Sequence, residues 1–260
     1  MFILNRANLD DATTWASSIF SGINFLMNSR FVNSVSNAIN NISAHYDISN
    51  DMFASFLSKD MTYSCAIFES KDESLETAQY RKLDRIIRQA RITSEDRVLE
   101  IGSGWGSFAI RAATKTGCRV TTLTLSIEQK VLAEERIKAA GLQDRISVVL
   151  CDYRQHVPEK PYDKIVSIEM IEAVGREFLE TYFAKVNDFL KEEGGIAVFQ
   201  VITMPETRYE RYCKEVDFIR KWVEPPFFLS DSDLSRRTFA DRFWSCRRHQ
   251  FGIQGYPDRG

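Results

Sequence analysis

The sequence predicts an α/β fold in which a mostly parallel sheet carries helices on both faces and follows an N-terminal helical extension. Three observations predict this class. Short apolar runs alternate with helical patterns over residues 91–223. Gly117, Gly141 and the pair at 194–195 stand where those helices should end. The first apolar run leads through a glycine-rich turn at 102–106 straight into a helical pattern. Strands joined by helices in this way pair in parallel, and the helices cover both faces of the sheet.

The chain divides into three parts along its length. They are the helical extension over 1–90, which also covers the expected ligand site, the core over 91–223 and an atypical tail over 224–260. Strands of the core are expected at 97–101, 119–123, 146–150, 164–168 and 196–202. Helices are expected at 105–116, 127–140 and 177–191, and a charged helical stretch follows from 206 to 223. Ligands of such sheets bind beyond the carboxyl ends of the strands, so we expect the site at the turn 102–106.

Two helices are expected in the second half of the extension. Ser49 or Asn50 is a candidate cap for a short helix that runs through Leu57. Residues 74–91 form a longer helix, because their apolar positions suit one buried face. Further upstream, the interrupted apolar stretch 15–27 predicts an amphipathic helix that either packs on its own protein or touches lipid.

Composition narrows the class of protein. The chain is 44% hydrophobic and 27% charged, which suits one sizeable core, and its net charge of −2 offers no general attraction to nucleic acid. Its 5 cysteines form no CxxC pair and its 3 histidines lie far apart, so we expect a reduced compartment and no metal site. We expect neither a secretory signal nor a membrane-spanning segment, and therefore a cytoplasmic protein.

The glycine turn predicts the kind of ligand. Glu100 ends the first strand, and Gly102, Gly104 and Gly106 follow at alternate positions. A dinucleotide fingerprint wants its third glycine one place later, where Ser107 stands. An acid followed by this glycine spacing suits a zwitterionic, cationic ligand and is typical of S-adenosylmethionine (SAM) methyltransferases. The alternatives are a purely structural turn and another nucleotide site, such as that of an NAD-dependent oxidoreductase.

Polar residues at the ends of the next two strands suggest further contacts with this ligand. Thr124 and Gln129 offer a hydroxyl and an amide, whereas Ser126 is either a ligand contact or a helix cap. After the third strand, Asp152 could accept from the amine of an adenine and Tyr153 could stack on its ring. The competing interpretation of Asp152 is an ordinary turn residue.

Two acids follow the fourth strand. Glu169 and Glu172 are three residues apart and would share one side of a helical turn. One of them could act as a base or bind a polar species. A solvated helix start, where acids favour the helix dipole, explains both without any chemistry.

Four segments carry a resemblance to a known family. They are HYDISND at 45–51, MTYSCA at 61–66, EIGSGWG at 100–106, and LTLS at 123–126 with Gln129. In order and spacing they resemble the cyclopropane-fatty-acyl-phospholipid synthase family, over about residues 44–223. The resemblance implies a class I SAM methyltransferase that acts on an unsaturated phospholipid acyl chain at a membrane surface. Methyl transfer to a cis double bond would give a carbocation, and loss of a proton to a bound bicarbonate would close a cyclopropane ring. A homodimer is the assembly considered.

The resemblance also implies roles for individual residues. Contacts with the methionine part of SAM would come from Tyr63, Ser64 and the backbone of Gly102 and Gly104. The ribose and adenine would be lined by Thr124, Leu125, Gln129 and Tyr153. Bicarbonate would be held by Cys65, the carbonyl of Ile168, Glu172 and Gln200. Without the resemblance, Cys65 would be interpreted as a buried small hydrophobe.

Three departures from the family pattern bear on activity. Many members have histidine where this chain has Ala173 and Gln200, and an amide donates a hydrogen bond but cannot shuttle a proton. After Val223 the sequence continues Glu-Pro-Pro-Phe at 224–227, the match stops, and no later tyrosine fits the family's catalytic one. We therefore expect a truncated or rerouted C-terminus without the final antiparallel strands. Two alternative functions follow: a methyl-branching lipid methyltransferase, and a SAM-binding protein with little or no activity.

Overall fold

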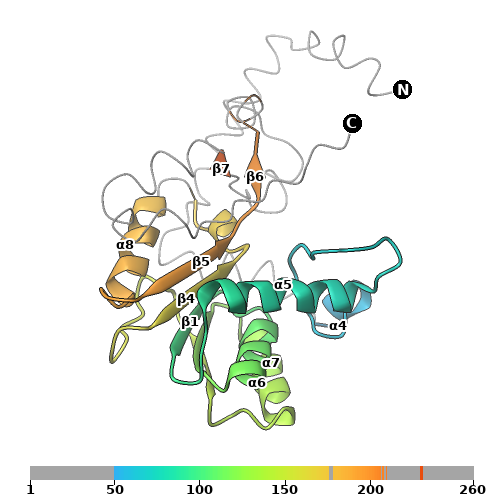
Figure 1. Cartoon of the computed structure of the whole chain (residues 1–260), viewed down its shortest axis with the longest axis horizontal. Coiled ribbons are helices and arrows are strands. Elements are labelled where there is room, and N and C mark those ends of the chain that lie inside the picture. Colours follow the sequence, from blue (N-terminus) through green and yellow to red (C-terminus); the bar gives the residue numbers. More distant parts are fainter. Residues whose placement is uncertain (1–49, 176–177, 206, 208, 210–228, 231–260) are drawn as a thin grey trace.

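A computed structural model describes residues 50–175, 178–205, 207, 209 and 229–230 and contains the expected parallel sheet. Its five strands are β1 (Arg97–Ile101), β2 (Arg119–Thr124), β3 (Ile146–Leu150), β4 (Lys164–Ile168) and β5 (Ile196–Gln200). They lie in the order β3-β2-β1-β4-β5, and all pairs are parallel (Figure 1). The first strand therefore lies in the middle, and the chain reverses its direction of winding beside it. Ligands of open parallel sheets bind at such a point.

Helices cover both faces of this sheet, as predicted. One face packs on α5 (Leu75–Ala90), α6 (Ser107–Thr116) and α7 (Ile127–Ala139), and the other face packs on α8 (Leu179–Phe189) (Figure 1). Neighbouring residues of β1 separate the two cores, because side chains alternate along a strand. Val98 contributes to the first core and Leu99 to the second, and both are fully buried.

Capping residues explain where the helices begin and end. The Ser74 hydroxyl accepts the N–H of Thr77 at 3.2 Å, so α5 begins at residue 75. Helix α6 begins at 107 rather than at the predicted 105, because Gly106 adopts a left-handed conformation (φ 83°) in front of it. Gly117 ends α6 with φ 78°, as expected. The last strand ends at Gln200 rather than at 202, and the chain turns there into β6 (Thr203–Met204).

Two short elements complete the described part of the chain. Helix α4 spans Asn50–Phe56, so Asn50 is its first residue rather than its cap. β6 pairs in parallel with β7 (Leu229–Ser230), which falls in the predicted tail. Three predictions lie outside the described residues: the amphipathic helix at 15–27, the helical stretch at 210–223, and the absence of final antiparallel strands in the rest of the tail.

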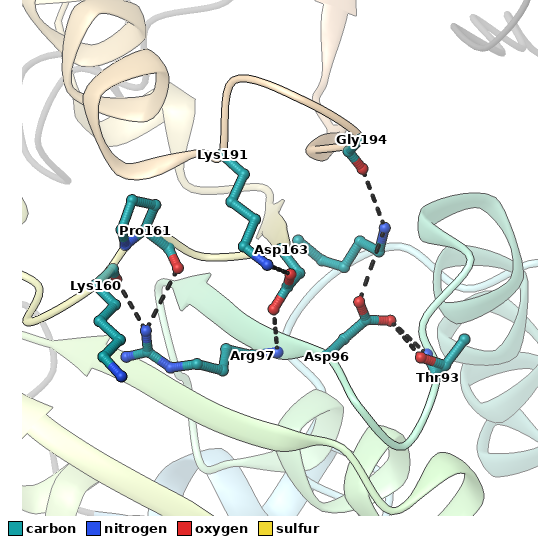
Figure 2. A network of polar contacts seen from close by, with 9 residues as sticks. Thr93, Asp96, Arg97, Lys160, Pro161, Asp163, Lys191 and Gly194 are labelled. Atoms are coloured by element: carbon teal, nitrogen blue, oxygen red, sulfur yellow. Dashed lines mark hydrogen bonds and ion pairs between the residues drawn. The ribbon is translucent and has the colours of Figure 1, made fainter.

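Charged groups fasten the amino ends of β1, β4 and β5 together (Figure 2). The Asp163 carboxylate accepts the N–H of Arg97 at 2.8 Å and forms an ion pair with Lys191. Asp96 accepts the N–H of Thr93 at 2.6 Å. The amine of Lys164 lies between Asp96, at 3.9 Å, and the carbonyl of Gly194, at 3.4 Å. The amino ends of the strands are opposite to their carboxyl ends, where the glycine turn lies.

No helix among the described residues combines the length and the apolar character that crossing a bilayer requires.

Candidate functional site

The glycine turn lies at the carboxyl end of β1, against the end of β2. The N–H groups of Gly102 and Ser103 donate to the carbonyl of Leu123, at 3.1 and 2.8 Å. Gly104 has φ 48°, and a Cβ placed on it would meet no atom within 4 Å. A Cβ on Gly106 would lie 3.3 Å from Cβ of Ala133, so that glycine lets the turn pack closely on α7. The open side of the turn is therefore at Gly104.

Trp105 attaches α4 and the following segment to the turn. Its indole N–H donates to Oδ1 of Asn50 at 2.7 Å, and its ring packs on Phe53 with centroids 4.9 Å apart. The guanidinium of Arg136 donates to the carbonyls of Trp105 and Asp60, at 2.6 and 2.7 Å. Residues 50–60 of the extension are thus fastened to the core beside the glycine turn. That they cover a bound cofactor stays a prediction.

Side chains of α5 hydrogen-bond to the segment that contains Tyr63 and Ser64. Gln79 donates its side-chain N–H to the carbonyl of Ser64 at 2.7 Å, and the amine of Lys82 donates to the Ser64 hydroxyl. Tyr63 is 50% exposed and packs edge-on against Phe53. Two buried side chains therefore fix the backbone of this segment, and the tyrosine ring stays accessible.

Lys82 is a member of the site that the sequence analysis missed. Only 1% of the residue is exposed, and burial lowers the pKa of its ammonium to about 8, although the nearby carboxylate of Glu169 favours the charged form. Ala78, Ile86 and Ala90, at four-residue intervals from Lys82, are all buried. A lysine within such an apolar row is the signal that could have identified it.

Cys65, Glu169 and Gln200 meet although they come from three separate segments. Oε1 of Glu169 accepts the N–H of Cys65 at 3.0 Å and the side-chain N–H of Gln200 at 2.7 Å. Gln200 Nε2 also lies 3.3 Å from the sulfur of Cys65. Ile168, the last residue of β4, pairs in register with Gln200. The structure thus brings Cys65, Ile168 and Gln200 together and adds Glu169, one of the two acids that the sequence offered as a base, and their contact with a ligand stays a prediction.

The environment of Cys65 differs from the expectation made without the resemblance. The residue is exposed, so the interpretation as a buried small hydrophobe is wrong. Desolvation of its sulfur and the adjacent Glu169 carboxylate nevertheless raise the pKa of the thiol to about 11. Cys65 is therefore a neutral thiol near neutral pH. Its backbone N–H donates to Glu169, and its sulfur lies beside the amide of Gln200.

Glu172 lies in a short 3-10 helix, η2 (Ile171–Ala173), and is buried. Its Oε1 accepts the N–H of Ile202 at 2.5 Å, whereas no described group donates to its buried Oε2. Burial raises the pKa of its carboxyl to about 7. Glu169 precedes η2 with a left-handed φ of 48°. The two acids therefore do not form a solvated helix start.

The residues expected around ribose bond to each other. The Thr124 hydroxyl donates to Oε1 of Gln129 at 2.9 Å and accepts the N–H of Ser126 at 3.1 Å. The Ser126 hydroxyl accepts the N–H of Gln129 at 3.2 Å, so Ser126 is the N-cap of α7. Leu125 is partly buried between them. These contacts place a polar wall beside the turn, and its contact with ribose stays a prediction.

The two residues expected around adenine are also tied to the protein. The buried Asp152 carboxylate accepts the N–H of Arg154 at 2.9 Å and its guanidinium at 2.5 Å, as in the turn-residue alternative. Tyr153 packs edge-on against Tyr182 at a centroid distance of 5.1 Å, and burial raises the pKa of its phenol to about 12. Neither contact tests a stacked or hydrogen-bonded adenine.

Glu100 lies within the sheet rather than at its edge. Its carboxyl accepts the hydroxyl of Thr122, the neighbouring residue on β2, at 2.6 Å. Full burial raises the pKa of this carboxyl to about 8. Near neutral pH it is therefore mainly protonated and can itself donate a hydrogen bond. Through the described segments, no group of three or more His, Cys, Asp or Glu side chains is arranged to hold a metal ion.

The cluster does not fit the bicarbonate that the family resemblance implies. The Cys65 N–H and the Gln200 amide both donate to the carboxylate of Glu169. A bicarbonate held by Cys65 and Gln200 would have to displace that carboxylate or lie against it, and like charges at such distances repel. The buried carboxyl of Glu172 on the same side adds to this repulsion whenever it is ionised.

The strand order, the helices on both faces and the glycine turn after the central strand define a Rossmann-like, class I methyltransferase fold. Sequence comparison then identifies the family. The model of the family described as "Mycolic acid cyclopropane synthetase" matches residues 33–241, and the chain belongs to this family. The match extends beyond the segment that carried the resemblance at both ends.

Individual relatives agree with this assignment. The chain is 43% identical over 192 residues to "Tuberculostearic acid methyltransferase UfaA1" of Mycobacterium tuberculosis, a match that covers 71% of this chain and 44% of that protein. It is 41% identical over 150 residues to "Cyclopropane-fatty-acyl-phospholipid synthase" of Escherichia coli, covering 58% of this chain and 37% of that protein. The chain thus spans less than half the length of these two relatives.

A solved structure also resembles the fold. It is the mycolic acid cyclopropane synthase CmaA1 complexed with SAH and CTAB, with a TM-score of 0.66 and 28% identity. The similarity covers 77% of this chain and 72% of that chain.

Proposed function

We propose that this chain is a SAM-dependent lipid methyltransferase. It would transfer a methyl group to the cis double bond of an unsaturated phospholipid acyl chain at a membrane surface and form a cyclopropane ring. The observation that carries this proposal is the meeting of Cys65, Glu169 and Gln200 beside the open glycine turn. Family membership supports the same reaction class.

The site suits SAM in shape and charge. The open space at Gly104 leaves room for a ligand close to the backbone, as the glycine spacing predicts. The methionine part would lie against Gly102, Tyr63 and Ser64. The carboxylate of Glu169 lies against Cys65, the residue after Ser64, and a carboxylate attracts a sulfonium cation. When bound, SAM supplies an electrophilic methyl group.

The remaining residues would orient the cofactor and keep water away. Thr124, Leu125 and Gln129 would line the ribose, and Asp152 and Tyr153 would border the adenine. Tyr63 and Phe53 form an aromatic wall, with ring centroids 5.4 Å apart, that would shield a carbocation and stabilise it through the ring faces. Because the donors of the cluster already bind Glu169, bicarbonate has no place in this proposal.

A second candidate product is a methyl-branched chain. The relative named as a tuberculostearic acid methyltransferase is 43% identical to this chain, which favours this alternative. The two products arise from the same cation. Loss of a methyl proton from that cation closes the ring, whereas a 1,2-hydride shift that moves the charge to the methyl-bearing carbon, followed by loss of a methyl proton, leaves a methylene branch. Mass spectrometry distinguishes a cyclopropane from a methylene-branched chain, because the two fragment differently.

The decisive experiment incubates the purified chain with methyl-labelled SAM and vesicles of a cis-unsaturated phospholipid. We expect label in the acyl chains, none with saturated vesicles, and strong loss in Glu172→Gln. Calorimetric titration should detect SAM and not NAD. SAM binding without transfer in any lipid would leave a SAM-binding protein with little activity, and NAD binding alone would contradict the proposal.

Two parts of the proposal concern location and assembly. Co-sedimentation with vesicles tests attachment to a membrane surface, and light scattering tests the homodimer. Failure of either one would remove that part and leave methyl transfer itself to be judged by the labelling experiment.

A further inference from the structure

We propose that Glu169 accepts the proton released in the reaction, so that the chain carries its own base where a bicarbonate was expected. The inference rests on the proposed function, since it names the base of that same site. The observation behind it is the pair of donors on Oε1 of Glu169, from Cys65 and Gln200. These are two of the groups that the family resemblance assigns to bicarbonate.

The backbone of Glu169 directs its side chain into this position. Its φ of 48° is uncommon for a residue with a side chain and costs on the order of 1 kcal/mol or more. The N–H of Glu169 donates to the carbonyl of Gln200 at 2.8 Å, which fixes the conformation. Because of this left-handed conformation, Glu169 does not lie on one helical face with Glu172. Its carboxylate instead reaches Cys65, 104 residues earlier in the chain.

Glu169 is better placed than its neighbours to receive a proton. Glu172 is buried, and Oε1 of its carboxyl is held by the backbone of Ile202. Gln200 can donate a hydrogen bond but cannot take up a proton. Glu169 is only partly buried and lies next to the exposed Cys65 and to the buried ammonium of Lys82. Of the two acids, Glu169 is the less buried one.

The chemistry balances without any further reactant. Transfer of the methyl group breaks its bond to sulfur, forms a bond to one alkene carbon and leaves a cation on the other. A C–H bond of the new methyl group then breaks. Its electron pair closes the ring, and its proton goes to the carboxylate of Glu169, whose Oε1 accepts the N–H groups of Cys65 and Gln200. The proton is later released to water. A weak base suffices, since the cation makes that C–H bond strongly acidic.

Substitution at position 169 can convert the chain to one that needs an added base. Glu169→Gly accepts the left-handed backbone without strain and frees the Cys65 and Gln200 donors. We expect it to lose at least about a hundredfold in methyl transfer and to recover, in a saturable way, with added bicarbonate. Glu169→Gln should lose as much and not recover, because its amide fills the same space. Glu193→Gln, at an exposed site in the turn before β5, is the control.

The wild-type chain should turn over equally fast in CO2-free buffer and with added bicarbonate. A rate that collapses in CO2-free buffer and returns with bicarbonate would overturn the inference, as would full activity in Glu169→Gln. Binding of 13C-labelled bicarbonate, followed by NMR, is independent of turnover: Glu169→Gly should bind it and the wild type should not. Equal binding by both chains overturns the inference even if methyl transfer is never observed, whereas failure of the proposed function would appear as lack of SAM binding.

Discussion

Lys82→Met tests whether the buried ammonium that donates to Ser64 lowers the free energy of unfolding of the chain. The side chain is 1% exposed, and burial lowers its pKa from 10.5 to about 8. At a pH below both values, this shift corresponds to a cost of about 3 kcal/mol for keeping the ammonium charged in the folded state. Methionine has a similar length and no charge, so Lys82→Met removes that cost.

The sign of the pH dependence follows from the lowered pKa. The wild-type chain gains stability as pH rises from about 8 towards 10.5 and loses it as pH falls through about 8. Lys82→Met lacks this dependence. We therefore expect the difference in free energy of unfolding between the two chains to change by about 2.5 kcal/mol between about pH 7 and about pH 10. The variant is the more stable chain at the lower pH.

Urea unfolding at both pH values measures this difference, and Lys138→Met, at an exposed position on α7, is the control. SAM affinity should fall about tenfold in Lys82→Met, because the Ser64 hydroxyl loses its donor. Parallel stability curves for the wild type and Lys82→Met would refute the reasoning. A gain in stability at about pH 7 combined with weaker SAM binding would support it.

Three further substitutions have definite expected outcomes. Arg136→Met should cost about 3 kcal/mol in urea unfolding and weaken SAM binding, because two backbone carbonyls lose a charged donor. Gly195→Ala should lower the melting temperature more than Gly194→Ala, since its Cβ would lie 2.4 Å from a backbone oxygen, whereas a Cβ on Gly194 meets nothing within 4 Å and adds only the strain of its φ of 72°. Wild-type stability should fall as pH rises from 4.5 through about 7, where Glu172 ionises in the folded chain. Glu172→Gln should make this slope shallower, leaving the part that comes from Glu100, and be up to about 3 kcal/mol more stable above that range. Equal slopes in both chains would contradict it.

The core of the fold follows closely from local patterns in the sequence. The bounds of β1, β3 and β4 agree with the expected ones, because each is a short apolar run ended by a turn residue. The turn at 102–106 was placed correctly for the same reason. Bounds failed where a neighbour mattered: β5 ends two residues early because the chain turns there into β6. Such effects depend on tertiary partners that propensity does not contain.

The site was harder to predict, because its members meet across the fold. Glu169 and Glu172 were paired by helical spacing, and the left-handed conformation of Glu169 breaks that spacing. Asn50 was one of two candidate helix caps, the other being Ser49, yet its side-chain oxygen accepts the indole N–H of Trp105, 55 residues later. Asp152 had two interpretations in the sequence, and the guanidinium of Arg154 occupies its carboxylate. A single sequence offers no means of choosing between a local partner and a distant one.

The charged network around Asp163, shown in Figure 2, lies at the opposite ends of the strands from the candidate site. It holds the amino ends of the strands together, whereas the glycine turn follows a carboxyl end. Substitutions in the network should therefore change the free energy of unfolding and not the reaction. Burial raises the pKa of the Asp163 carboxyl. The ion pair with Lys191 and the N–H of Arg97 outweigh burial and hold that pKa below its usual range. Acid tolerance and product choice can therefore be adjusted independently, one at each end of the same strands.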